Sequence, residues 1–171
     1  MKAPSHFPLP LNIGTDICQV SRIFRLLTGP RGTRFLHRVL TPEERAAASA
    51  TQLRPLPAPA GPLDGGFEAL RANYPEWWQR STFVAGRFAA KEAAFKAHPF
   101  WRLGFGDVVV SKPEGWEGHG SGPPVAVVGG AGGGQSALLS ISHDGDYATA
   151  VCLGFDRRVG GLGGDGGRAS S

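Results

Sequence analysis

The stretch that most restricts the fold is residues 83–97, which contain no proline and are rich in alanine. This composition predicts a helix, with Ser81 and Thr82 as candidate caps. At 100° per residue the large apolar side chains gather on one side and the small residues roughly opposite them: Val84, Phe88 and Phe95 against Gly86, Ala90, Ala93 and Ala97. A helix that is apolar nearly all round is usually buried. The chain must therefore fold another layer of structure around this helix.

The last third of the chain predicts that layer. Short β-prone runs occupy residues 108–110, 125–128, 138–142 and 148–155, and glycine-containing loops at 115–124 and 129–134 separate the first three runs. The last two runs are separated by an Asp144-Gly145 pair, which is a good hairpin signal. These features predict an antiparallel sheet, and with the helices an α+β fold in which a buried central helix packs against a mostly antiparallel sheet.

The first third predicts one more strand and two further helices. Residues 11–14 form a short apolar strand, and the next apolar residues recur at helical spacing until Gly29-Pro30 ends that helix. Thr41-Pro42-Glu43-Glu44 then places a hydroxyl at the N-cap, proline at the first helical position and glutamate three residues after the cap. This combination predicts a helix that runs to about residue 50.

The length of 171 residues favours a single domain. We assign residues 11–157 to that domain, 1–10 to a flexible N-terminus, 53–66 to a Pro/Gly-rich insertion loop and 158–171 to a disordered Gly-rich tail. The sequence contains neither an apolar run of about 18 to 20 residues nor a signal-peptide core. Cys18 and Cys152 stand far apart, which favours a reducing compartment. We therefore expect an intracellular protein, mitochondrial or cytoplasmic and not secreted.

The predicted central helix carries charges that need partners, namely Arg87, Lys91, Glu92 and Lys96. Glu92 and Lys96 are four residues apart, so a surface ion pair of about 0.2 to 0.5 kcal/mol explains them most simply. If the helix is buried, a second explanation becomes comparable: these charges bind an anionic ligand or a metal in a cleft between the helix and another element. Asp16 alone reads most simply as an N-cap, and His143 as a turn residue. The net charge of +4 favours an acidic partner.

Four motifs, taken in order, resemble one known family, the small holo-acyl-carrier-protein synthases, a type of 4'-phosphopantetheinyl transferase, with fungal members nearest in kind. The motifs are Ile13-Gly14-Thr15-Asp16-Ile17, the run from Arg34-Phe35 to Thr41-Pro42-Glu43-Glu44, the run Ala85-Gly86-Arg87-Phe88-Ala89-Ala90-Lys91-Glu92-Ala93-Ala94-Phe95-Lys96-Ala97, and Ser140-Ile141-Ser142-His143 with Tyr147-Ala148. The helix motif is the most specific of the four.

The resemblance implies an enzyme of fatty acid biosynthesis that moves phosphopantetheine from coenzyme A to a serine of an apo acyl carrier protein and releases adenosine 3',5'-bisphosphate. It implies Mg²⁺ held by Asp16 and Glu92, since magnesium takes one or two carboxylates plus phosphate oxygens. Lys96 would contact the transferred or leaving phosphate, and His143 the nucleotide, with a possible role as base. The base that takes the serine proton is either Glu92 or a metal-bound water.

The resemblance also gives roles to the remaining basic residues. Arg87 and Lys91 would bind phosphate or hold the helix to its surroundings. A dense arginine group would meet the acidic carrier protein: Arg22, Arg25, Arg31, Arg34 and Arg38. Bacterial members are commonly trimers with active sites between subunits, so a homotrimer is an expectation, with neither nucleic acid nor membrane as partner. Where many members have a glycine-containing loop after the helix, residues 98–102 would reshape the nucleotide pocket.

One alternative is a non-enzymatic basic α+β module that binds RNA or another polyanion. Its arginines would contact phosphates, and three tryptophans would stack on bases: Trp77, Trp78 and Trp101. This alternative predicts that Asp16 and Glu92 can be replaced without loss of binding. A transferase-like fold without catalysis is a second alternative, against which the presence of Asp16, Glu92 and Lys96 argues.

Overall fold

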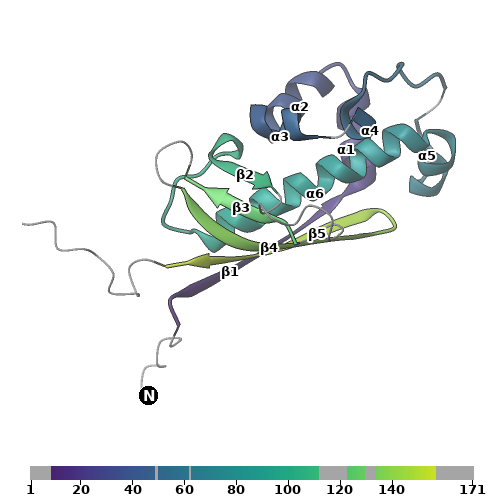
Figure 1. Cartoon of the computed structure of the whole chain (residues 1–171). Helices are drawn as coiled ribbons and strands as arrows, with labels where there is room; N and C mark the ends of the chain where they lie inside the picture. The colour runs from purple at the N-terminus through teal and green to yellow at the C-terminus, as the bar shows by residue number, and fades with distance from the viewer. Residues whose placement is uncertain (1–8, 49, 62, 112–122, 130–133, 157–171) are drawn as a thin grey trace, which may run out of the picture.

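The computed structural model describes residues 9–48, 50–61, 63–111, 123–129 and 134–156. Five antiparallel strands form one sheet in the order β1-β5-β4-β3-β2, and the long helix α6 crosses one face of it (Figure 1). The α+β prediction is confirmed. The expectations for the N-terminus, for most of the two glycine-containing loops and for the C-terminal tail concern residues outside the described part of the chain.

The sheet consists of β1 (Leu11–Gln19), β2 (Val108–Ser111), β3 (Val125–Val128), β4 (Gln135–Asp144) and β5 (Tyr147–Phe155). The four predicted C-terminal strands are confirmed, and β4 is longer than expected at both ends. Asp144 pairs with Tyr147, so the β4–β5 hairpin turns in two residues. Gly145 takes a positive φ of 52° there, which explains the glycine.

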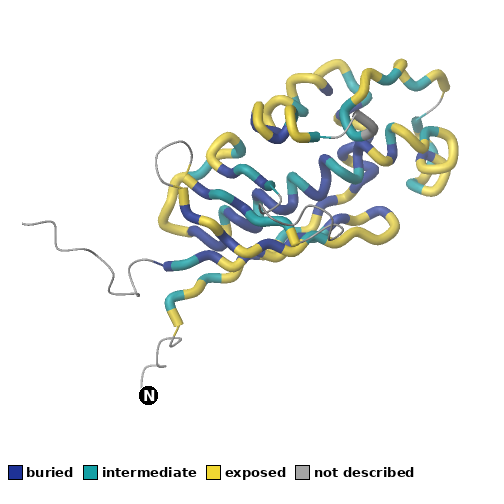
Figure 2. Tube along the Cα trace, in the orientation of Figure 1, coloured by how far each residue is buried: buried dark blue, intermediate teal, exposed yellow. Residues whose placement is uncertain are grey.

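Helix α6 extends from Pro75 to Ala97, so it begins earlier than predicted. Pro75 occupies the first turn, where a missing N–H costs nothing. Ser81 and Thr82 are therefore not caps; their hydroxyls donate to the carbonyls of Trp77 and Trp78, one turn back. The predicted burial of the helix is confirmed, as its alanines at 85, 89, 90, 93, 94 and 97 are 0% exposed (Figure 2).

Strand β1 corrects the sequence prediction most. The strand was expected to end at Gly14, but it pairs with β5 as far as Gln19, and α1 (Val20–Thr28) begins only after that. Asp16 therefore lies inside a strand and is not an N-cap. Gly14 is needed for close approach and not for a turn, since a Cβ there would lie 1.9 Å from the carbonyl oxygen of Ala93 in α6.

Four short helices follow α1 at one end of the sheet: α2 (Gly32–Val39), α3 (Pro42–Ala47), α4 (Ala50–Leu53) and α5 (Phe67–Asn73). The capping box predicted for Thr41 and Glu44 is present at the start of α3. That helix ends at Ala47, earlier than the predicted end at about residue 50, and helices α2, α4 and α5 were not predicted. Within the described residues no helix is both long and apolar enough to cross a membrane.

The proline-rich segment has no helix or strand from residue 54 to 61 or from 63 to 66, as its prolines predicted. It is nevertheless attached to α6. The indole N–H of Trp77 donates to the Pro57 carbonyl at 2.9 Å, and the Arg80 guanidinium donates to the Gln52 carbonyl at 3.3 Å. That this segment is an insertion stays a prediction.

Candidate functional site

The first site element is a contact between β1 and α6. The Lys96 ammonium lies 2.8 Å from Asp16 Oδ1 and also donates to the Thr15 carbonyl at 2.8 Å. Asp16 faces the helix because β1 alternates, with Gly14 and Cys18 on the same side. The simple explanation was an ion pair between Glu92 and Lys96 within the helix. In the structure Lys96 instead forms its ion pair with Asp16 on the strand.

Glu92 belongs to the same cluster. Burial raises its pKa, the negative charge of Asp16 raises it further, and the positive charges of Lys96 and Arg22 lower it. Two carboxylates from different elements thus lie close enough to repel each other. A divalent cation between them would remove that repulsion.

Arg22 completes the cluster. Its guanidinium lies over the Phe88 ring, 5.3 Å from the centroid, and donates to Cys18 Sγ at 3.5 Å. The turn from β1 into α1 after Gln19 places Arg22 near Glu92, whose pKa its positive charge lowers. Its grouping with the carrier-facing arginines stays a prediction.

Lys91 is placed differently from the expectation for a phosphate ligand. Its side chain is 0% exposed, and its ammonium lies 2.6 Å from Glu44 Oε2 and 2.9 Å from the Phe105 carbonyl. Burial lowers its pKa, whereas the hydrogen bond to Glu44 raises it. Lys91 holds the helix to its surroundings, and so we leave it out of the proposed phosphate site. Arg87 packs over the Phe83 ring at 5.1 Å.

His143 lies apart from the carboxylate pair. It is exposed on β4, where it pairs with Ala148, and Ala148 pairs in turn with Cys18 of β1. Two strand spacings of about 4.8 Å therefore separate His143 from β1. Among the described residues, no hydrogen bond or ion pair joins His143 to Asp16 or Glu92.

A basic groove lies between α1 and α2. It has a volume of about 550 Å³ and is lined by five residues: Leu26, Arg31, Arg34, Phe35 and Arg38. Three of the five predicted partner-binding arginines thus meet here, around an apolar floor. Arg25 instead donates to the Gly65 carbonyl at 3.3 Å, which leaves it at the edge of this surface.

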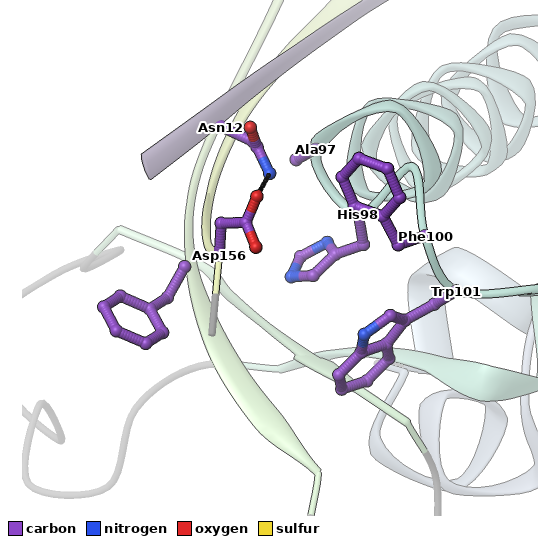
Figure 3. Close-up of a pocket in the computed structure, with 7 residues that line it drawn as sticks. Asn12, Ala97, His98, Phe100, Trp101 and Asp156 are labelled. Atoms are coloured by element: carbon purple, nitrogen blue, oxygen red, sulfur yellow. Dashed lines mark hydrogen bonds between the residues drawn. The ribbon is translucent and has the colours of Figure 1, made fainter. Parts of the chain in front are cut away.

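A small second pocket of about 50 Å³ lies at the C-terminal end of α6 (Figure 3). His98 and Trp101 face Asn12 and Asp156 across it. His98 Nδ1 lies 2.8 Å from the Ala94 carbonyl, which makes Nδ1 the donor nitrogen of this ring. Asn12 precedes Asp16 by four strand residues, or about 13 Å, so this pocket is distinct from the carboxylate pair.

The site suits magnesium by its donor types. Asp16 and Glu92 offer hard carboxylate oxygens, and magnesium needs only one or two of them because water and phosphate fill its other positions. Among the residues that the structure describes, no group of three or more His, Cys, Asp and Glu could hold a metal ion. A binding mode that needs three or more protein ligands therefore fits these residues less well.

Glu44 is the residue that sequence reasoning missed. The sequence indicated that Glu44 belongs to a capping box with Thr41, but a capping box uses only some of the hydrogen bonds that a carboxylate can accept. The Glu44 carboxylate also accepts hydrogen bonds from Lys91 and from the Val110 amide. The signal available in the sequence was the buried charge of Lys91, which needed an acidic partner.

Comparisons with known proteins identify the family of this chain. The family model of the 4'-phosphopantetheinyl transferase superfamily matches residues 12–152. The mitochondrial 4'-phosphopantetheinyl transferase B of Aspergillus fumigatus is 39% identical over 155 residues, covering 86% of this chain and 95% of the relative. The holo-acyl-carrier-protein synthase of Anaeromyxobacter dehalogenans strain 2CP-1 is 33% identical over 158 residues, covering 84% and 94%.

A solved structure is similar as well. The holo-acyl-carrier-protein synthase of Bacillus anthracis in complex with CoA (3',5'-ADP) matches with a TM-score of 0.51 and 28% identity, covering 83% of this chain and 93% of that one. The resemblance seen in the motifs is thereby confirmed, and the RNA-binding alternative is not favoured. This chain belongs to the 4'-phosphopantetheinyl transferase superfamily, as an enzyme of the holo-acyl-carrier-protein synthase type.

Proposed function

We propose that this enzyme transfers 4'-phosphopantetheine from coenzyme A to a serine of an apo acyl carrier protein, with adenosine 3',5'-bisphosphate as the second product. The observation that carries the proposal is the meeting of Asp16, Glu92 and Lys96 between β1 and α6. The names of the relatives and the nucleotide in the Bacillus anthracis complex support it.

In this proposal the serine oxygen forms a bond to the phosphorus that carries pantetheine, and the bond from that phosphorus to the adenosine bisphosphate oxygen breaks. Lys96, whose side chain is 52% exposed beside Asp16, stabilises the negative charge on the diphosphate. Glu92, or a water that it orients, takes the serine proton; its raised pKa suits this role. Magnesium held by Asp16 and Glu92 supplies charge neutralisation at the diphosphate.

Release of adenosine 3',5'-bisphosphate tests the reaction. The purified chain is incubated with coenzyme A, Mg²⁺ and an apo carrier protein, and the nucleotide is quantified by chromatography. We expect release that requires the carrier serine and stops with its alanine variant. Release at the same rate without carrier protein would show hydrolysis of coenzyme A and contradict the transfer.

The basic groove is the proposed docking surface for an acidic carrier helix. Opposite charge speeds encounter and fixes orientation, and Leu26 and Phe35 add an apolar contact. We expect Arg34→Glu to raise the KM for carrier protein about tenfold, because a like charge then opposes docking, and to leave kcat within about threefold. The difference should shrink at high salt, since surface charges are screened.

Arg71→Glu is the matched control for this charge reversal. Arg71 is exposed on α5 and lies outside the groove. Initial rates at varied carrier concentration provide the measurement for both variants. An equal rise of KM in Arg71→Glu would show that overall charge, and not this groove, attracts the carrier.

The outer face of the sheet is the proposed trimer interface. Ile13 and Leu138 are each 69% exposed and flank Leu153 across β1, β5 and β4, and other apolar residues continue the face: Leu11, Ile17 and Val151. Exposed apolar surface of this kind is typical of protein interfaces. In the proposed trimer, a neighbouring subunit would supply His143 to the carboxylate pair, to which it is not hydrogen-bonded within one chain.

We expect Leu153→Asp to convert a trimer to a monomer and to lower transfer at least about tenfold, because a buried unpaired charge opposes association. Light scattering coupled to size exclusion measures the mass, and Ala72→Asp on the exposed side of α5 is the control. A wild-type chain that is monomeric at working concentration and fully active would refute both the interface and the shared site.

A mitochondrial location is proposed over a cytoplasmic one. The Aspergillus fumigatus relative is named mitochondrial, and it is 39% identical to this chain. Imaging of a C-terminally tagged full-length protein tests this, and a uniform cytoplasmic signal would overturn it.

A further inference from the structure

Glu44 sits in a network that the catalytic proposal does not use. Its Oε2 accepts from the Thr41 amide at 2.8 Å and from the Lys91 ammonium at 2.6 Å, and its Oε1 accepts from the Val110 amide at 3.1 Å. Lys91 also donates to the Phe105 carbonyl at 2.9 Å. The two side chains are 1% and 0% exposed, so the pair is inaccessible to any ligand.

This pair connects the two halves of the proposed site. Glu44 is in α3, directly after α2, whose arginines line the basic groove. Lys91 is in α6, adjacent to Glu92 in sequence and five residues before Lys96, which contacts Asp16. Through Phe105 and Val110 the same pair also holds η1 (Phe105–Asp107) and β2.

Ring contacts also connect α6 with α2 and η1, and they are less directional than the ion pair. Phe35 stacks on Phe88 at 6.4 Å between centroids, and Phe88 in turn packs on Phe105 at 5.2 Å. Aromatic contacts of this kind tolerate sliding and tilting, whereas a carboxylate with three donors has one geometry. A buried ion pair contributes little net stability, so its value lies in specifying one arrangement of the elements that it joins.

We propose that Glu44 and Lys91 are positioning residues, which fix the arginine groove at the distance and angle from Asp16, Glu92 and Lys96 that aligns the carrier serine with coenzyme A. This inference rests on the proposed function. Coenzyme A contacts neither residue, because both are buried. Loss of the pair should therefore impair steps that need the carrier protein and spare binding of coenzyme A.

Three variants separate positioning from simple destabilisation. Lys91→Met keeps the length of the side chain but leaves the Glu44 carboxylate buried and unpaired. Glu44→Gln/Lys91→Met removes both charges together, which limits the loss of stability. Thr41→Ala removes the hydroxyl cap of α3 and leaves the ion pair and the Thr41 amide in place, so it is the matched control.

We expect Lys91→Met to lower Tm by roughly 10 °C and the double variant to lower it less. The double variant should raise the KM for carrier protein at least about tenfold and lower kcat, since a small misplacement of a reacting group is costly. Its Kd for coenzyme A with Mg²⁺, from calorimetry, should stay within about twofold of wild type. Thr41→Ala should keep the wild-type KM.

Wild-type kinetics in the double variant would overturn the positioning role, as would a loss of coenzyme A affinity that matches the loss of rate. If the wild-type enzyme transfers nothing, the proposed function fails instead. Amide hydrogen exchange is a test that does not depend on activity. The amides of residues 32–39 should exchange faster in the double variant than in the wild type, while those of residues 88–97 stay protected. Unchanged exchange in residues 32–39 would reject the inference whatever the activity.

Discussion

Asp16→Asn and Glu92→Gln are each expected to lower kcat for phosphopantetheine transfer about a thousandfold or more while the protein stays folded. Each substitution removes one of the two carboxylates that lie together between β1 and α6. In the proposed magnesium site, the loss of one carboxylate would weaken the hold on the cation at the diphosphate, and charge that develops in the transition state would be less well compensated. Initial rates at saturating coenzyme A and carrier protein measure the effect.

Glu92→Gln should lower kcat but should not lower the stability of the fold. The pKa of Glu92 is raised in the folded protein, chiefly by burial and then by Asp16. A carboxyl group with a raised pKa destabilises the fold above its unfolded pKa, because the folded state disfavours the charged form. We therefore expect Glu92→Gln to match or exceed the wild-type Tm at pH 7 without Mg²⁺.

Glu68→Gln on α5 is the matched control, since it makes the same chemical change at an exposed position away from the site. It should keep wild-type kcat and coenzyme A affinity. If Asp16→Asn and Glu92→Gln also kept more than about a tenth of the wild-type kcat, the assignment of the two carboxylates would be wrong.

Gly14→Ala is expected to destabilise the fold strongly. The added Cβ would lie 1.9 Å from the Ala93 carbonyl oxygen and 2.6 Å from the Ala97 nitrogen, both backbone atoms of α6. Backbone cannot rotate away as a flexible side chain can, so the helix must move off the strand. We expect a loss of at least about 3 kcal/mol in the free energy of unfolding and a Tm lower by roughly 10 °C.

The same displacement should reduce activity beyond the loss of folded protein, because Asp16 on β1 and Lys96 on α6 are then separated. Denaturant unfolding and transfer rates measured well below Tm check the two effects. Gly106→Ala is the control, since nothing lies within 4 Å of a Cβ at that glycine. A Gly14→Ala variant with wild-type stability and rate would contradict the close approach of strand and helix.

Much of the fold could be predicted from local pattern. The strands that became β2, β3, β4 and β5 are short β-prone runs bounded by turn residues, and the burial of α6 follows from apolar residues all round it. Helix α2 was not predicted because eight residues with a glycine at the start have little helical preference of their own. Its stability comes from packing, since Gly32 lies directly against Leu27 of α1.

Local sequence patterns predicted less of the site than of the fold. Spacing alone favoured an ion pair within the helix for Glu92 and Lys96, and an N-cap for Asp16. The N-cap interpretation was wrong because β5 pairs with β1 as far as Gln19, and no local signal in the first third of the chain encodes a partner from the last. Lys96 lies near Glu92 but makes its ion pair with Asp16, which spacing along the helix could not indicate. Family resemblance supplied the pairing of Asp16 with Glu92, and in the structure the charge of Asp16 raises the pKa of Glu92.

The central claim is that this chain moves phosphopantetheine onto a carrier protein through the Asp16–Glu92 pair, and intact mass of the carrier tests it most directly. An apo acyl carrier protein is incubated with coenzyme A, Mg²⁺ and the wild-type chain or either carboxylate variant. We predict that the carrier gains the mass of one phosphopantetheine with the wild-type chain only. Absence of any gain with several apo carriers, or an equal gain with Asp16→Asn and Glu92→Gln, would contradict the account.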